Sequence, residues 1–229
     1  MTSERVALVT GANRGIGLEV CRQLAAQGLT VLLGARDQAK GEAAVSGLPG
    51  TVRAVALDVS RDASVEALRE RVEREYGRLD VLVNNAGILY DDWEDASTAD
   101  LATVQEAFNT NTLGAWRTCK AFVPLLRQGR SPRIVNVSSV SGSLSNMREA
   151  PAYSVSKAAL NALTVLLAVE VQREGILVNA VCPGWVATDM GGAGGRPVSE
   201  GAASIMWAVT LPDHGPTGGF FQDGRRLRW

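Results

Sequence analysis

A tyrosine and a lysine stand four positions apart in a segment whose composition favours a helix. Alanines and leucines follow Tyr153 and Lys157, so both polar side chains are expected on one helical face. A neighbouring ammonium favours a phenolate, and we expect it to lower the pKa of Tyr153 from its ordinary value near ~10. Pro151 would begin this helix, which places Tyr153 in the first turn, where the helix dipole favours a phenolate further. Tyr153 could therefore donate and accept a proton near neutral pH; the alternative is a chance spacing on a solvated face.

Two further polar residues have the chemistry to assist such a tyrosine. Ser139 follows the apolar strand predicted at 133–138, so its hydroxyl is expected at the carboxyl edge of a sheet, where α/β folds bind ligands. Ser138 and Ser141 compete for this position, but strand alternation turns Ser138 to the opposite face, and loop-forming serines are the alternative. Asn111 lies within a long predicted helix, where its amide competes with helix hydrogen bonds and is a mild liability.

The elements that would position these residues alternate between short apolar strands and helices. Such alternation predicts a parallel sheet with helices on both faces and right-handed crossovers. The sequence therefore predicts an α/β fold, a Rossmann-type doubly wound parallel sheet, forming one domain over residues 1–229. The predicted strands are 6–10, 30–33, 52–57, 79–84, 133–138 and 176–182, with an edge strand at 217–221, and the predicted helices end at 28 and span 38–47, 61–76, 98–128, 151–174 and 199–209.

The composition excludes several classes of function. The 229 residues carry a net charge of −1 with both signs interspersed, so no basic surface is predicted for nucleic acid or an anionic membrane. Cys21, Cys119 and Cys182 lack metal-ligand spacing and are expected to be small buried residues, not a disulfide or zinc framework. No apolar run approaches the roughly 18 residues that span a bilayer, and the N-terminus lacks the apolar core of a signal peptide. We expect a cytoplasmic protein that acts on a small neutral or anionic molecule.

A glycine-rich loop joins the first predicted strand to the first helix. Backbone N–H groups in such a loop can hold a pyrophosphate, helped by the dipole of the following helix. The loop's place inside a β-α-β unit makes this interpretation stronger than a glycine triplet alone. The residues expected at the phosphates are Gly11, Asn13, Arg14, Gly15, Ile16 and Gly17.

The spacing T-G-x-x-x-G-x-G in this loop resembles the fingerprint of the classical short-chain dehydrogenase/reductases, and the resemblance runs from about residue 5 to 190. The N-N-A-G of 84–87 matches a family motif whose asparagines brace neighbouring strands. Asp58 matches the acid that contacts adenine, with capping of the next helix as its alternative. The P-G-x-x-x-T of 183–188 matches the segment that contacts the carboxamide, which implies hydride transfer from the pro-S face. The resemblance adds to the cofactor site Asp58, Val59, Asn85, Ala86, Gly87, Tyr153, Lys157, Pro183, Gly184, Trp185, Val186 and Thr188.

The same resemblance implies roles for the four catalytic candidates. Tyr153 would be the general acid in carbonyl reduction and the base in alcohol oxidation, and Ser139 would hydrogen-bond the substrate oxygen. Lys157 would lower the pKa of Tyr153 and hold the nicotinamide ribose. Asn111 would bind a water linked to the lysine, which would give a proton relay, while the hydride chemistry belongs to the nicotinamide.

The end of the second strand predicts NADP(H) as the cofactor. The family's NAD-selective aspartate falls at Ala35, Arg36 follows it, and Arg14 in the glycine loop is a second cation. Paired guanidiniums match a phosphate bidentately, so they favour the 2′-phosphate of NADP(H). Asp37 argues the other way, but we interpret it as the N-cap of the next helix.

Within the family, this chain looks most like the carbonyl-reductase branch, whose members reduce ketones and aldehydes with NADPH. The residues that carry this likeness are Arg36–Asp37, Asn13–Gly15 and 218–224. The leading prediction is NADPH-dependent reduction of a ketone or aldehyde. An NAD-dependent alcohol or steroid dehydrogenase and a non-catalytic nucleotide-bound regulator are the alternatives.

One departure from that branch bears on assembly. Its monomeric animal members carry a long insert before the catalytic tyrosine, and only thirteen residues separate Ser139 from Tyr153 here. The predicted helices 98–128 and 151–174 are thus open to pairing, and we expect a homodimer or homotetramer.

The remaining expectations concern the substrate and two loops. A nonpolar or aryl carbonyl compound is expected, with ordinary core packing as the alternative for the apolar residues concerned. The glycine-dense segment 191–195 is predicted to be a mobile lid. The basic tail 225–229 is either solvated or docked on another subunit or over the site. The substrate residues expected are Trp93, Leu144, Asn146, Met147, Trp185 and Met190.

Overall fold

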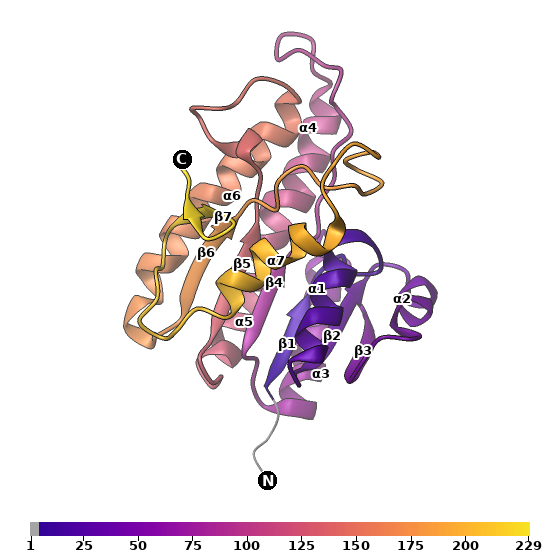
Figure 1. Ribbon diagram of the computed structural model, residues 1–229, viewed down its shortest axis with the longest axis vertical. Coiled ribbons are helices and arrows are strands. Elements are labelled where there is room, and N and C mark those ends of the chain that lie inside the picture. The colour runs from indigo at the N-terminus through magenta and orange to yellow at the C-terminus, as the bar shows by residue number, and fades with distance from the viewer. Residues whose placement is uncertain (1–4) are drawn as a thin grey trace.

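An eight-stranded sheet forms the centre of the protein, whose computed structural model describes residues 5–229 (Figure 1). The strands are β1 (Val6–Val9), β2 (Thr30–Ala35), β3 (Thr51–Ala56), β4 (Val81–Asn84), β5 (Arg133–Val137), β6 (Leu177–Val181), β7 (Phe220–Gln222) and β8 (Arg225–Arg226). Their order is β3-β2-β1-β4-β5-β6-β7-β8, and every neighbouring pair is parallel except β7 and β8. The order changes direction between β1 and β4, which is where ligands bind in doubly wound sheets. The predicted fold class is confirmed.

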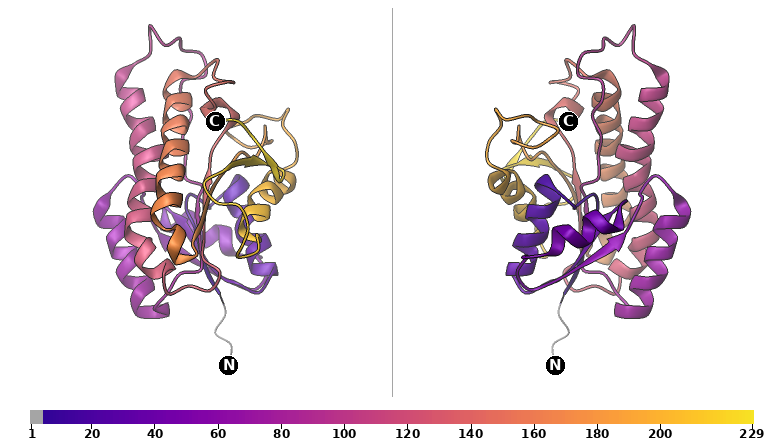
Figure 2. Two further views of the ribbon diagram at one scale, coloured as in Figure 1. Left: turned by 90° about the vertical axis from the view of Figure 1, so that its left-hand side faces the viewer. Right: turned by 90° about the vertical axis from the view of Figure 1, so that its right-hand side faces the viewer.

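Helices cover both faces of this sheet (Figure 2). One face packs against α3, α5 and α6, and the other against α1, α2 and α7. The two apolar layers arise because β1, β4, β5 and β6 are buried along their whole lengths, so their side chains point alternately into one layer and the other. The helices are α1 (Gly15–Ala26), α2 (Gln38–Val45), α3 (Asp62–Tyr76), α4 (Leu101–Ala107), α5 (Leu113–Leu126), α6 (Pro151–Glu170) and α7 (Val198–Val209).

The long helix predicted at 98–128 is interrupted. It divides into α4 and α5, with a π-helical turn at Phe108–Thr112 between them. Single π-turns widen a helix locally and often occur at functional sites. The interruption matters here because this turn carries Asn111.

The C-terminal tail pairs with the sheet, whereas the sequence left the position of residues 225–229 open. The predicted edge strand at 217–221 is shifted to β7, and the chain then turns back as β8. The Trp229 ring stacks on the buried Phe220 ring at a centroid distance of 5.5 Å. A tail over the site is wrong, because the tail pairs with its own sheet and none of its residues lines the pocket. Its arginines are exposed, as a solvated tail would have them, and docking on another subunit stays a prediction.

Among residues 5–229, α6 is the one helix long and apolar enough to cross a membrane by length and composition. The expectation that no segment reaches that length is therefore wrong. However, 56% of its apolar stretch is buried inside the protein, where it packs on β5 and β6. Leu160, Leu163 and Leu167 of this helix belong to the core, whereas Leu166 and Val169 are exposed.

Candidate active site

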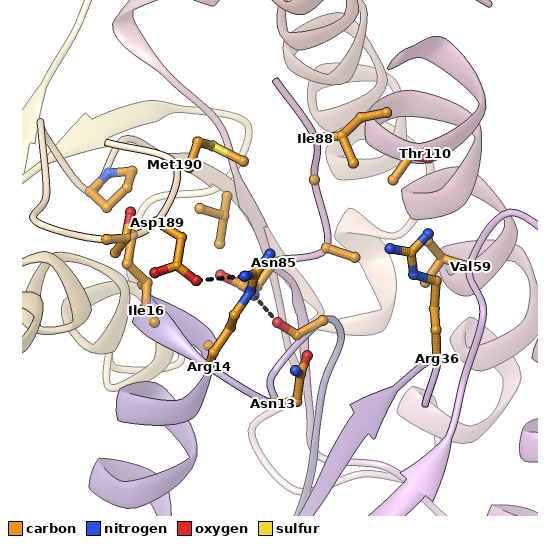
Figure 3. Close-up of a pocket in the computed structure, with 18 of the residues that line it drawn as sticks. Asn13, Arg14, Ile16, Arg36, Val59, Asn85, Ile88, Thr110, Asp189 and Met190 are labelled. Carbon is orange, nitrogen blue, oxygen red and sulfur yellow. Dashed lines mark hydrogen bonds and ion pairs between the residues drawn. The ribbon is translucent and has the colours of Figure 1, made fainter. Parts of the chain in front are cut away.

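A pocket of about 740 Å³ opens at the carboxyl ends of the central strands (Figure 3). It runs from the glycine loop after β1, past the ends of β2 and β3, to the first turns of α6. This continuity brings together parts of the chain that are far apart in sequence, from Gly11 to Val198. Of the predicted cofactor residues, the following line it: Gly11, Asn13, Arg14, Gly15, Ile16, Gly17, Arg36, Asp58, Val59, Asn85, Ala86, Gly87, Tyr153, Lys157, Pro183 and Thr188.

The glycine loop is held in shape by Asn85. Its amide donates to the carbonyls of Thr10 and Gly11 at 2.9 and 3.0 Å, and the Thr10 hydroxyl accepts from the backbone N–H groups of Asn85 and Ala86. Gly11 adopts a φ of 61°, and a Cβ there would lie 2.8 Å from Ala86 Cα, so only glycine fits. The start of α1 has no side-chain cap and no acidic residue in its first turn, so its N–H groups face the pocket. This end can hold an anion.

Two cations stand at the other end of the pocket, beyond β2. Arg36 follows the strand and has no ion-pair partner within the described residues, and Lys40 lines the pocket one helical turn later. Asp37 caps α2 by accepting from the Lys40 N–H at 3.1 Å, which confirms its interpretation as an N-cap. Arg14, by contrast, pairs with Asp189 at 2.5 Å, and Figure 3 shows this pair at the left of the pocket and Arg36 at the right. Both arginines line the pocket, and their joint binding of a phosphate stays a prediction that would need Arg14 to leave Asp189. Lys40 is the cation nearest to Arg36 in sequence.

Asp58 lies at the carboxyl end of β3. Its carboxylate accepts from the backbone N–H and the hydroxyl of Ser60 at 3.0 and 2.6 Å, so it stabilises the turn before α3. The N-cap of α3 is Arg61, without a side-chain bond, so capping of that helix by Asp58 is wrong. Asp58 and Val59 both line the pocket, which leaves contact with adenine as a prediction.

Tyr153 and Lys157 meet on one face of α6, as predicted. The Lys157 ammonium lies 5.5 Å from the centre of the Tyr153 ring and donates to the Val137 carbonyl at 2.9 Å. Ser139 hydrogen-bonds to the Tyr153 phenol from the end of β5. These three side chains therefore form one cluster; Tyr153 and Lys157 line the pocket, whereas Ser139 is not among its lining residues.

The pKa of Tyr153 differs from the expectation. Burial raises it to about 12, and the hydrogen bond with Ser139 only partly opposes that rise. Burial also lowers the pKa of Lys157 to about 8, because a desolvated ammonium is disfavoured. The lysine is thus a weaker source of positive charge than its type suggests, and the predicted lowering of the tyrosine pKa is wrong for the pocket as it stands.

Asn111 projects from the π-turn into a buried network. Its amide oxygen accepts from the Ile88 N–H at 2.8 Å, and its nitrogen donates to the Ile88 carbonyl and to the Ser156 hydroxyl at 3.0 and 2.9 Å. Gly87 lies between Lys157 and Asn111. A Cβ at this position would lie 3.3 Å from Lys157 Nζ and 3.4 Å from Asn111 Oδ1, so a larger residue would crowd both groups. Asn111 joins the loop after β4 to α6 beside the lysine.

Other polar residues of the motifs are structural. Ser138 is buried and donates to Asn161 at 2.7 Å, and the hydrogen bond to the Tyr153 phenol comes from Ser139, although Ser138 also lines the pocket. The Asn84 amide donates to Asn136 at 2.8 Å and accepts from Thr118 at 2.6 Å, and Asn136 donates to Thr164 at 2.9 Å. This chain of bonds ties α5 and α6 to the middle of the sheet, as predicted for the bracing asparagines.

The segment after β6 is only partly in the pocket. Pro183 and Thr188 line it, whereas the predicted residues Gly184, Trp185 and Val186 do not. The Trp185 side chain is 68% exposed and donates to the Gly191 carbonyl at 2.7 Å, so it holds the glycine-dense segment from outside. Motion of that segment stays a prediction.

The predicted substrate residues lie on the surface. Trp93, Leu144 and Trp185 are largely exposed, and Met190 lines the pocket, so core packing is wrong as an account of them. Asn146 is exposed and Met147 half-buried. Contact of these side chains with a substrate stays a prediction.

Sequence reasoning missed several residues at the pocket. Lys40 had a usable signal, since it falls four positions after Arg36 at the start of a helix. Ile88, Thr110 and Asp189 had none, because each is brought to the pocket by long-range folding. Asp91, buried beneath the start of α6, was also missed. No group of three metal-ligating side chains gathers anywhere in residues 5–229.

Comparisons with known proteins agree with this arrangement. The family model for short chain dehydrogenase matches residues 5–196. The chain is 36% identical to (+)-neomenthol dehydrogenase of Arabidopsis thaliana, with 95% of each chain covered, and 36% identical to carbonyl reductase (NADPH) 1 of Mus musculus, with 100% of each covered. Among solved structures, NADPH-bound carbonyl reductase from chicken fatty liver aligns with a TM-score of 0.87 at 30% identity, covering 99% of both chains. The resemblance predicted from the motifs is confirmed, and this chain belongs to the short-chain dehydrogenase family.

Proposed function

We propose that the protein reduces a ketone or aldehyde to an alcohol with NADPH. The observation that carries this proposal is one continuous pocket, which joins an anion-binding glycine loop to Tyr153 and Lys157, with Ser139 hydrogen-bonded to the Tyr153 phenol. The carbonyl reductases among its relatives support it, since the mouse enzyme is named for NADPH and the chicken structure holds it.

The residues of the pocket fit a dinucleotide. The uncapped N-terminus of α1 offers N–H groups to a pyrophosphate, and Arg36 and Lys40 offer positive charge to a 2′-phosphate. Ala35, at the end of β2, leaves no carboxylate to repel that phosphate. Asp58 and Val59 would flank the adenine, and Tyr153, Lys157, Pro183 and Thr188 would border the nicotinamide end. When bound, the coenzyme supplies the hydride.

The chain's own residues would handle the proton. Ser139 would hydrogen-bond the substrate oxygen, and Tyr153 would donate its phenolic proton to that oxygen as negative charge develops. Lys157 would hold the ribose and act on the phenol as a nearby cation. Asn111, through its bonds to Ser156 and Ile88, would hold the first turns of α6, and with them Tyr153 and Lys157, in position.

Tyr153 is in the state that a proton donor needs. Burial raises its pKa to about 12, so the phenol stays protonated at neutral pH. The end of β2 weighs against an NAD-dependent alcohol or steroid dehydrogenase, because Ala35 and Arg36 offer no carboxylate to a free ribose hydroxyl. The intact group of Asn111, Ser139, Tyr153 and Lys157 weighs against a non-catalytic regulator.

Apolar side chains on the segments that leave the carboxyl edge of the sheet support a nonpolar or aryl substrate. Met190 lines the pocket, and exposed Trp93, Leu144 and Trp185 stand on the segments that follow β4, β5 and β6. Exposed apolar side chains gathered near a concave site are typical of binding surfaces. A panel of benzaldehyde, acetophenone and aliphatic aldehydes should show a preference for the aryl compounds.

The proposal is tested by Tyr153→Phe, which removes only the phenolic oxygen. NADPH oxidation in the presence of a carbonyl panel, followed by nicotinamide absorbance, should fall by about 10² to 10⁴ in kcat. The dissociation constant for NADPH, measured by fluorescence titration, should stay within about twofold. Tyr76→Phe is the matched control, because Tyr76 lies at the end of α3, outside the pocket, where its hydroxyl accepts from the exposed Arg53. Activity of Tyr153→Phe equal to that of the control would contradict the assignment.

We also propose that residues 1–229 act as one domain in a cytoplasmic homodimer or homotetramer. Leu113, Trp116, Leu166 and Val169 on α5 and α6 are exposed, and burying these helices together would remove apolar surface from water. The alignment with the mouse enzyme spans 282 positions against the 229 residues of this chain, consistent with an insert in the relative. Light scattering should give a multiple of the 24.2 kDa chain mass, and Leu166→Lys should reduce it; a monomer mass for the unmodified protein would contradict the assembly.

A further inference from the structure

A buried carboxylate lies beneath the first turn of α6, outside every motif that the sequence supplied. Asp91 is 1% exposed and stands four positions beyond Gly87 in the loop that follows β4. One of its oxygens accepts from the Ala152 N–H at 2.5 Å, and the other faces the Tyr153 N–H at 3.3 Å. Within the described residues, no cation pairs with it.

The sequence at the start of α6 cannot cap the helix by itself. The N-cap residue is Ala150, which has no side-chain acceptor and adopts a left-handed φ of 50°. Pro151, at the first helical position, has no N–H to donate. The free N–H groups of this turn therefore belong to Ala152 and Tyr153, and Asp91 supplies the acceptors from 61 positions away.

The backbone of Tyr153 is held on its other side as well. Its carbonyl accepts from the Ser156 hydroxyl at 2.7 Å, and that hydroxyl accepts from Asn111, which also bonds to Ile88. Ile88 and Asp91 belong to the same loop. The bonds thus form a closed ring from this loop through Asn111 and Ser156 to Tyr153, and through Asp91 back to the loop.

We propose that Asp91 is a positioning residue for proton transfer. Its carboxylate fixes the first turn of α6, so that the Tyr153 phenol stands at a set distance from Ser139 and from the loop that frames the pocket. The charge is balanced by the two N–H groups and by the positive end of the helix dipole. This inference rests on the proposed carbonyl reduction for its catalytic consequence, while its structural part stands without it.

The test compares Asp91→Ala with Asp91→Asn and with Asp100→Ala in the full chain. Asp100 is the matched control, because it caps α4 in the same way, accepting from the Ala102 N–H at 3.0 Å, but lies on the surface. In Asp91→Ala, kcat with benzaldehyde should fall at least about tenfold, since a small misplacement of a catalytic group is costly. The KM and dissociation constant for NADPH should stay within about twofold, because the glycine loop and Arg36 are untouched.

Asp91→Asn keeps one acceptor oxygen, so its kcat should lie between those of Asp91→Ala and the unmodified protein. The same comparison with the asparagine variant tests the role of Asp91 if Asp91→Ala does not fold. Asp100→Ala should leave kcat unchanged even where it lowers the melting temperature. A kcat for Asp91→Ala within twofold of the unmodified protein, or an equal loss in Asp100→Ala, would overturn the proposal.

Amide hydrogen exchange separates this proposal from the proposed function. Asp91→Ala should speed exchange at Ala152 and Tyr153 by about tenfold or more while the middle of α6 stays protected. If the unmodified protein reduced no carbonyl compound in the panel, the proposed function would fail, and the exchange data would still decide on Asp91. Unchanged exchange in the first turn would overturn the positioning role.

Discussion

Raising the pH should stabilise the folded protein through Lys157. The folded-state pKa of this buried lysine is about 8, because burial lowers it from the ordinary value of 10.5. Below about pH 8 the amine is charged in both states, and the folded state carries the full cost of a desolvated ammonium. Above it the folded lysine loses its proton while the unfolded one keeps it. The unfolded state then binds more protons, so the free energy of unfolding rises with pH.

The size of this effect follows from the two pKa values. Each unit of pKa difference corresponds to about 1.4 kcal/mol, so between about pH 7 and pH 10 Lys157 should add roughly 2 to 3 kcal/mol to the free energy of unfolding. Tyr153 and the buried Cys119, whose pKa values are raised to about 12, act in the opposite direction at higher pH, as does Cys182. A comparison of two proteins that share these groups removes their contribution.

The assay is urea unfolding of the unmodified protein and Lys157→Met at a series of pH values, without cofactor. Methionine keeps most of the side-chain volume and cannot titrate. Because Lys157 also donates to the Val137 carbonyl, the absolute stability of the variant is not the readout; the difference between the two pH slopes is. The unmodified protein should gain the predicted 2 to 3 kcal/mol relative to the variant. Parallel curves would refute the reasoning that burial depresses the pKa of Lys157.

Two further predictions concern the cofactor. Arg36→Asp should weaken NADPH binding by about tenfold or more and shift the coenzyme preference toward NADH, because a charge-assisted bond to a phosphate contributes about 1.5 to 3 kcal/mol. Fluorescence titration measures both dissociation constants, with Arg53→Asp on exposed β3 as the control. An unchanged preference for NADPH would show that Arg36 is not the determinant. Asp189→Asn should free Arg14 from its exposed ion pair and strengthen NADPH binding at low salt by no more than about fivefold; weaker binding would instead mean that the ion pair helps to close the pocket.

Local patterns carried most of the fold prediction. Strands β1, β4, β5 and β6 were recognisable because both of their faces are buried, which leaves continuous apolar runs. The glycine loop and Asp37 were recognisable because a positive φ and a helix N-cap each demand particular residue types.

Features that depend on long-range contact were not recognisable. The π-turn at Phe108–Thr112 interrupts a segment with a continuous helical pattern, and its reason is the network of Asn111 with Ile88 and Ser156. The tail was equally ambiguous, since the stacking of Trp229 depends on where Phe220 lies in the sheet.

The sequence by itself determined which residues can do chemistry here: the spacing of Tyr153 and Lys157, the serine after β5 and the glycines after β1 are local facts. Only the tertiary structure decided the burial, the pKa values and the bonding partners of these residues. It desolvates Tyr153 and Lys157, which raises one pKa and lowers the other, and it turns Arg14 toward Asp189. It also places Asp91 beneath the first turn of α6. Burial and hydrogen bonding depend on partners far away in the chain, and a spacing pattern cannot contain them.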